Sequence, residues 1–120
     1  LRRELDGREE AQQVAEWQDR RETDSLVLYL THAEARYRER AALALASVQD
    51  SAAALPLGNV LLDDKDAQVR AAAAFALGQT RGFQPANALI PALTDADPMV
   101  RREALEALGK TIRKEDLGVL

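Results

Sequence analysis

Hydrophobic and polar positions repeat along this chain with a spacing of 31 residues. Residues 61–78 and 92–109 share the same order: apolar residues, two aspartates, a Val-Arg pair, an alanine three residues further on, and a final Ala-Leu-Gly. A further shift of 32 residues finds a weaker copy at 30–47, in which His32 and Glu34 stand where the acids were. A repeat of this length predicts stacked supersecondary units rather than one irregular domain.

Each unit predicts a helix, a tight turn and a second helix. In the last unit Val100, Ala104 and Leu108 recur at i, i+4 and i+8, which is one face of an α-helix. Asp97 is placed to cap this helix, and Pro98 suits its first position, where a missing N–H costs nothing. The sequence therefore predicts an all-α fold, an α-solenoid of antiparallel helical hairpins.

The predicted organisation is a single domain with five parts: an N-terminal capping helix at 1–20, a degraded repeat at 24–47, repeats at 53–80 and 85–111, and the start of a further, truncated repeat at 112–120. Leu5, Val14 and Trp17 are the expected buried side of the capping helix. Gly78 and Gly109 are expected near the ends of the second helices. Because the chain begins at Leu1, we expect a processed or trimmed product.

Composition narrows the function classes. Cysteine is absent, which excludes disulfides, thiolate metal ligands and a cysteine nucleophile. Sixteen basic and twenty acidic residues give a net charge of −4, which disfavours nucleic acid as a partner. No apolar run approaches the ~20 residues of a membrane-spanning helix. The compartment stays open between the cytoplasm and, if a signal sequence was removed, the periplasm or envelope.

The pattern Leu-x-Asp-x-Asp-x-x-Val-Arg-x-x-Ala-x-x-Ala-Leu-Gly resembles the HEAT repeat, in the short bacterial form named after phycobilisome lyases. Residues 53–80 and 85–111 match closely, and residues 24–47 match loosely. The resemblance implies the solenoid fold. It is almost silent about function, because the family includes scaffolds, adaptors, lyase subunits and modules fused to enzymes.

A second resemblance concerns the layout of the chain. The runs 17–21 (WQDRR), 28–30 (LYL) and 74–79 (AFALGQ) are similar to the start of bacterial proteins that join a HEAT array to a cyclophilin-type peptidyl-prolyl isomerase. This resemblance implies an isomerase domain downstream of the present residues.

Acidic and basic residues gather at the turns inside the hairpins. A functional interpretation would make the acids metal ligands or a general acid–base pair. Their place beside a helix start favours a structural role instead, because aspartate caps helices and arginine pairs with carboxylates. We predict a structural ladder along the stack, made by Asp64, Asp66, Arg70, Asp95, Asp97 and Arg101.

Catalytic chemistry has no visible basis in these residues. His32 is the only histidine and is interpreted as a turn residue, since a lone histidine makes a poor catalyst and a weak metal site. We predict no catalytic residues, no metal and no cofactor. The fragment is predicted not to be an enzyme, whereas the full-length protein stays open.

The second helices carry the candidate binding surface. Leu43, Phe75 and Glu106 occupy one equivalent position, so Leu43 and Phe75 are predicted to form an apolar strip on the concave face. The predicted polar rim consists of Glu39, Arg40, Gln79, Arg102, Glu103, Glu106 and Lys110. The alternative, that Phe75 and Leu43 simply pack into neighbouring helices, stays open.

The sequence thus favours a scaffold that binds a protein or peptide on its concave face. The alternative is an accessory repeat domain of a larger enzyme, of the peptidyl-prolyl isomerase or lyase type. The partner's identity and the oligomeric state stay open.

Overall fold

The computed structural model describes the backbone of residues 2–80 and 86–119 and the side chains of residues 7–80 and 86–111. The described chain contains no strand. Its elements are α1 (Arg2–Asp19), α2 (Thr23–Tyr29), α3 (Ala35–Val48), the 3₁₀ helix η1 (Ser51–Ala53), α4 (Ala54–Asp63), α5 (Ala67–Gln79), α6 (Ala86–Ala92) and α7 (Pro98–Val119).

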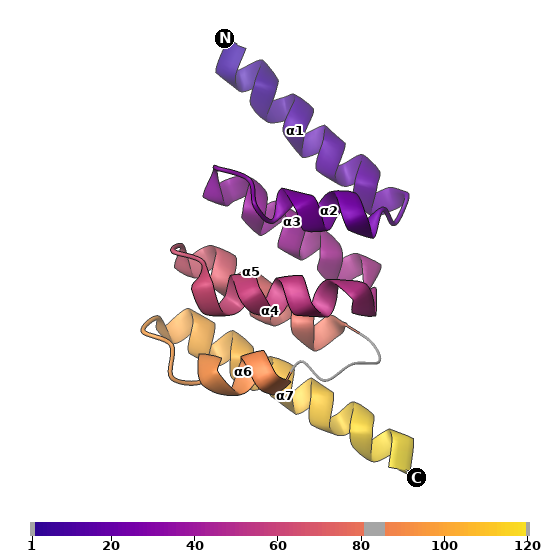
Figure 1. Cartoon of the computed structure of the whole chain (residues 1–120), viewed down its shortest axis with the longest axis vertical. Helices are drawn as coiled ribbons and strands as arrows, with labels where there is room; N and C mark the ends of the chain where they lie inside the picture. Colours follow the sequence, from indigo (N-terminus) through magenta and orange to yellow (C-terminus); the bar gives the residue numbers. More distant parts are fainter. Residues whose placement is uncertain (1, 81–85, 120) are drawn as a thin grey trace.

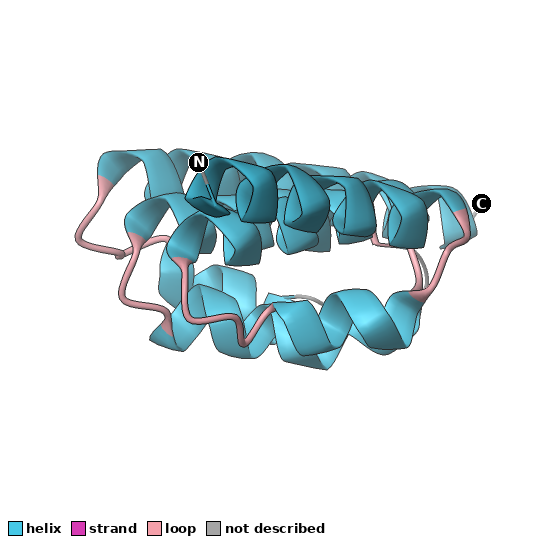
Figure 2. Ribbon diagram, turned by 90° about the horizontal axis from the view of Figure 1, so that it is seen from above, coloured by secondary structure: helices cyan, strands magenta, loops and turns pink. Residues whose placement is uncertain are grey.

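Three helical hairpins follow one another down the long axis of the molecule (Figure 1): α2–α3, α4–α5 and α6–α7. The view from above shows two layers (Figure 2). The first helices α2, α4 and α6 form one layer. The second helices α3, α5 and α7 form the other, and α1 continues it at the N-terminal end, packed against α3. The predicted all-α solenoid is confirmed.

Leucine and valine fill the space between the layers, and alanine sets the spacing within the second layer. The largest side chains that are fully buried are Leu26, Leu45, Leu57, Leu61, Leu77, Leu89, Val48, Val69 and Val100. On α5, four successive alanines at 71–74 are buried. Such small side chains let α5 lie close to α3 on one side and α7 on the other.

Gly78 allows a close approach between α5 and α7. A Cβ atom at Gly78 would lie 2.8 Å from the Cβ of Ala107 on α7. Gly78 is the second-last residue of α5, as expected, whereas Gly109 lies inside α7. The glycine of the repeat is therefore better explained by helix-to-helix contact than by a left-handed cap.

The C-terminal residues also differ from expectation. Residues 112–119 continue α7 and do not open a new hairpin. The helix continues because residues 111–115 contain no proline or glycine that would end it. Pro91 lies in the last turn of α6, which ends one residue later at Ala92.

The N-terminal helix covers the open end of the stack. Val14 is buried, and Trp17 is half-buried with its ring edge-on to Tyr29, 5.2 Å between centroids. The side chain of Leu5 lies outside the described residues. Arg21, at a positive φ of 56°, donates to the carbonyl of Val48 and ties the α1–α2 turn to the end of α3.

Candidate functional site

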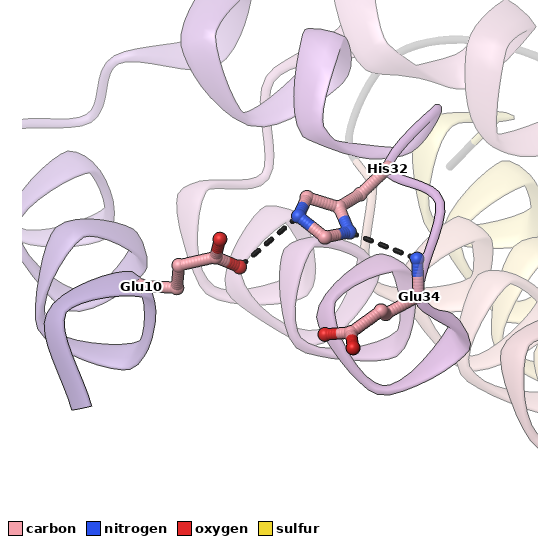
Figure 3. A group of neighbouring side chains, drawn as sticks. All are labelled: Glu10, His32 and Glu34. Atoms are coloured by element: carbon pink, nitrogen blue, oxygen red, sulfur yellow. Dashed lines mark hydrogen bonds and ion pairs between the residues drawn. The ribbon is translucent and has the colours of Figure 1, made fainter. Parts of the chain in front are cut away.

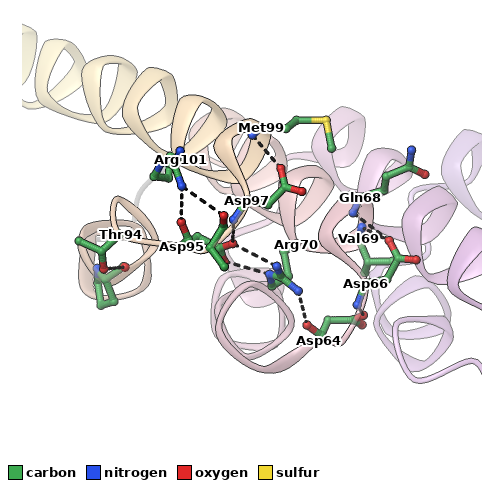
Figure 4. Close-up of polar contacts among 12 residues, drawn as sticks. Asp64, Asp66, Gln68, Val69, Arg70, Thr94, Asp95, Asp97, Met99 and Arg101 are labelled. Carbon is green, nitrogen blue, oxygen red and sulfur yellow. Dashed lines mark hydrogen bonds and ion pairs between the residues drawn. The ribbon is translucent and has the colours of Figure 1, made fainter.

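The turns between first and second helices line up along one edge of the stack, and arginines connect them. We call the turn residues 31–34, 64–66 and 95–97, with Arg38, Arg70 and Arg101, the turn edge. Arg70 donates from Nε and Nη2 to the two carboxylate oxygens of Asp95 in the next repeat, at 2.9 and 3.0 Å (Figure 4). Its Nη1 donates to the Asp64 carbonyl of its own turn, at 2.9 Å. One side chain thus fixes two turns.

Arg38 makes the same contacts one repeat earlier. Its Nε and Nη2 donate to Asp64 at 2.8 and 3.0 Å, and its Nη1 donates to the His32 carbonyl at 2.9 Å. The predicted ladder omitted Arg38, although the 32-residue shift aligns it with Arg70. This alignment could have predicted the role of Arg38. It was overlooked because the degraded repeat lacks the two aspartates of the motif.

Arg101 differs from the other two arginines. It donates from Nη1 to the carbonyls of Asp95 and Ala96 in its own turn, at 2.8 and 3.3 Å. It makes no ion pair with a described side chain and is exposed. The ladder therefore has two complete cross-repeat rungs, Arg38–Asp64 and Arg70–Asp95.

The two aspartates of each turn have separate roles. The second one caps the following helix: Asp66 accepts from the amides of Gln68 and Val69, and Asp97 accepts from the amide of Met99. The first one receives the arginine and also accepts the amide of the second, at 2.9 Å in both turns. The rung and the cap are thereby joined in one hydrogen-bonded turn.

These bonds favour the ionised carboxylates. The hydrogen bonds from Arg70 hold the pKa of Asp95 below its usual range, against a smaller opposing effect of burial. For Asp64, burial is the largest single influence and raises the pKa, but the bonds from Arg38 and the Asp66 amide together outweigh it, so this pKa also falls. Both turns are consequently built for charged aspartates at neutral pH.

His32 takes the place of the first aspartate at the N-terminal end of the edge. Its Nδ1 accepts the amide of Glu34 at 2.9 Å, as the aspartates do in the other turns (Figure 3). Its Nε2 lies 3.0 Å from Oε2 of Glu10 on α1. Burial, and then a hydrogen bond with the same Glu10 carboxylate, raise the pKa of Tyr29 to about 12. His32 therefore connects the capping helix to the first turn.

Glu10, His32 and Glu34 bring ligand-type atoms within 4.8 Å of one another. The hydrogen bond accepted by Nδ1 assigns the proton of the neutral ring to Nε2, the atom that faces Glu10. The nitrogen nearest the carboxylate then has no free lone pair for an ion. The contacts are accounted for by the turn, and we place no metal here.

A hollow of about 220 Å³ lies on the face formed by the second helices. Its floor is α5, with Gln68, Ala71, Ala72 and Phe75, and α3 and α7 are its two walls. Leu43 and Glu39 belong to the α3 wall, and Met99 and Glu103 to the α7 wall. Leu43 is 43% exposed and the ring of Phe75 is half-buried. We call this feature the second-helix hollow.

The structure divides the predicted binding residues into two groups. Leu43, Phe75, Glu39 and Glu103 line the second-helix hollow. The others lie outside the lining: Arg40, Arg102 and Glu106 are exposed, and Lys110 donates to Oε1 of Gln79 at 2.9 Å while lying 5.0 Å from the centre of the Phe75 ring.

Small residues in the middle repeat explain why a hollow exists. Ala71 aligns with Glu39 and Arg102 of the flanking repeats, and Ala72 aligns with Arg40 and Glu103. Long side chains therefore stand on either side of a floor that has only methyl groups at positions 71 and 72. The binding residues predicted from the sequence did not include Gln68, Ala71, Ala72 or Met99.

The first-helix face carries a different hollow, of about 510 Å³, which sequence reasoning also missed. Leu55, Gly58 and Leu62 of α4 line it together with Asn87 and Ala88 of α6. Its lining includes Leu77 and Asn87, and residues 81–85 between them in the sequence lie outside the described part of the chain. We build no site on it.

These features define the class of the protein: an α-solenoid whose turns are locked by arginine–aspartate rungs and whose open face is formed by second helices. The model of HEAT repeats matches residues 54–120, more than half of the chain, and the model of the PBS lyase HEAT-like repeat matches residues 37–63. The chain belongs to the HEAT-repeat family. The second match spans α3 to α4, so it begins at a second helix and ends at the next first helix.

No curated protein matches the chain. Among the described helices, none is long and apolar enough to cross a membrane. HEAT repeats are generally protein-interaction scaffolds.

Proposed function

We propose that this chain is a protein- or peptide-binding module that holds its partner on the second-helix face. The observation that carries the proposal is the second-helix hollow, in which apolar groups from α3, α5 and α7 converge around Ala71 and Ala72. A partly exposed leucine and aromatic ring beside polar groups form the kind of surface that takes an apolar anchor residue.

The size of the hollow supports a side chain as its occupant. At about 220 Å³ it falls below the ~300–1,000 Å³ typical of small-molecule and cofactor sites. The second helices also present their outward residues in three parallel rows, which suits an extended segment. No chemical step is proposed for these residues.

The proposal is tested with a displayed library of random peptides, selected on the immobilised 120-residue chain. Enriched peptides are then measured by fluorescence anisotropy against Leu43→Asp. We expect affinity to fall at least about tenfold, because a charge would replace part of the apolar wall.

Two exposed leucines of the other layer provide matched controls. Leu28 is 72% exposed and lines neither hollow, and Leu55 is 77% exposed and lines the first-helix hollow. Leu28→Asp and Leu55→Asp are expected to bind as wild type. Enriched peptides that bind Leu43→Asp normally but lose affinity for Leu55→Asp would move the site to the first-helix face.

A second candidate function is supported by the match to the PBS lyase HEAT-like repeat. In this case the chain is the accessory repeat domain of a larger enzyme, a lyase or a cyclophilin-type peptidyl-prolyl isomerase. The reading frame on both sides of these residues tests it: an adjoining catalytic domain is the expected result, and an uninterrupted array of repeats would count against it.

A further inference from the structure

We infer that the second-helix hollow selects a peptide segment in which one large apolar side chain lies between two lysine or arginine residues. The inference rests on the proposed function and adds the chemistry of the partner. Only two residues that line the hollow are charged, Glu39 and Glu103, and both are acidic. They stand on opposite walls, with Leu43, Phe75 and Met99 supplying the apolar contact.

Neither glutamate has a partner of its own. Among the described side chains, Glu39 and Glu103 make no ion pair, and no hydrogen bond to either carboxylate occurs there. This differs from the turn edge, where Asp64 and Asp95 are each held by two arginine nitrogens. Two unpaired carboxylates beside an apolar floor leave negative charge for a partner to neutralise.

None of four nearby cations pairs with either glutamate of the hollow. Arg36 pairs with Glu34 and lies over the Tyr37 ring. Lys110 is bonded to Gln79 and lies over Phe75. Arg40 and Arg102 are exposed and do not line the hollow. The acidic character of the hollow is therefore not cancelled by these cations, and the chain's net charge of −4 acts in the same direction.

The register of the repeats fixes where the charges stand. Glu39 aligns with Ala71, and Glu103 aligns with Ala72, so the two glutamates stand on either side of adjacent alanines of α5. Two helix-to-helix steps of about 8–10 Å separate the axes of α3 and α7 by roughly 16–20 Å. An extended chain covers that span in about five or six residues. Basic residues are thus expected two or three positions from the apolar anchor, one on each side.

Apolar contact and charge would have separate effects on binding. Burial of the anchor against Leu43, Phe75 and Met99 supplies most of the affinity, as in other interfaces with a central apolar residue. The two carboxylates lie at the edge of the contact, where they contribute specificity for basic peptides and make the affinity depend on salt concentration.

The experiment uses three matched sets of short synthetic peptides with a central leucine or phenylalanine, flanked by lysine and arginine, by serine, or by glutamate. Binding to the wild-type chain is measured by fluorescence anisotropy at low and high salt. We expect the basic set to bind about tenfold more tightly than the neutral set at low salt, and the acidic set to bind weakest. The double variant Glu39→Gln/Glu103→Gln should lose that tenfold preference, because each pair of a glutamate with a basic peptide residue is expected to raise the affinity roughly three-fold.

Glu106→Gln is the matched control, because Glu106 lies on α7 but is exposed and outside the lining. It should keep the preference for basic peptides. If neutral and basic peptides bound the wild-type chain equally well, the charge inference would be wrong. The proposed function would still stand if both sets lost affinity for Leu43→Asp. If Leu43→Asp changed the binding of none of the peptides, the proposed function and the inference would both be wrong.

Discussion

The turn edge and the second-helix hollow use acidic side chains in opposite ways. Along the turn edge, Arg38 and Arg70 each meet an aspartate of the next repeat in a two-point contact. In the hollow, Glu39 and Glu103 stand beside apolar side chains without a partner. The comparison separates charges that hold repeats together from charges that are available to another molecule. It predicts that substitutions at the turn edge change stability, whereas substitutions in the hollow change binding.

The largest expected effect is that of Arg70→Ala. The side chains of Arg70 and Asp95 are 15% and 12% exposed, so the substitution leaves a largely buried carboxylate without its main partner. We expect the free energy of unfolding, measured in urea, to fall by about 2–3 kcal/mol. Arg101→Ala, which removes bonds only within its own turn, should cost about 0.5 kcal/mol. Equal losses in the two variants would contradict a role for the cross-repeat rung.

Asp95→Asn should cost about 1–2 kcal/mol at pH 7, because the charge-assisted part of the rung is lost. The pKa of Asp95 is lowered in the folded chain, so its contribution to stability is fully present above the unfolded pKa of about 3.9. The contribution falls as the pH drops through the lower, folded value. Urea unfolding of both proteins from pH 7 to pH 2 should show their difference shrinking below about pH 4. A difference that stayed constant over this range would rule out the ionised rung.

Arg70→Lys tests the two-point geometry of the rung and should cost about 1 kcal/mol in urea unfolding. Lysine keeps the charge but cannot bind both Asp95 oxygens and the Asp64 carbonyl from one planar group. Stability equal to that of wild type would mean that charge alone holds the turns together.

The smallest effect on stability is expected in the hollow. Glu39→Gln and Glu103→Gln should each change the free energy of unfolding by less than about 0.5 kcal/mol, because no described group depends on either carboxylate. The same urea measurement provides the check. A loss near that of Arg70→Ala would show that these glutamates are structural after all.

Sequence alone predicted the solenoid because its signals are local and repeated. Capping aspartates and apolar residues at helical spacing each act within one turn or one hairpin, and they recur 31 residues later. The aspartate and arginine types of the ladder could be predicted for the same reason. Which carboxylate each arginine reaches depends on the distance between neighbouring hairpins. The order of residues within a single repeat does not predict that distance.

The missed features depend on packing between repeats. The place of Gly78 near the end of α5 was predicted, but its close packing against Ala107 of α7 was not. The hollow depends on short side chains at Ala71 and Ala72 lying between long ones on two other helices. Glu10 reaches His32 because α1 packs against the first hairpin. Since α1 is not part of a repeat, the repeat pattern does not predict its contacts.

The most direct test of the account is to map the binding surface on the folded chain by amide chemical-shift changes in NMR. The probe is a synthetic peptide with a central leucine between lysine and arginine residues. The account predicts that the largest changes fall in residues 39–43, 68–75 and 99–103, the three segments that line the second-helix hollow. Changes confined to residues 51–62 and 87–88, which line the first-helix hollow, would contradict it.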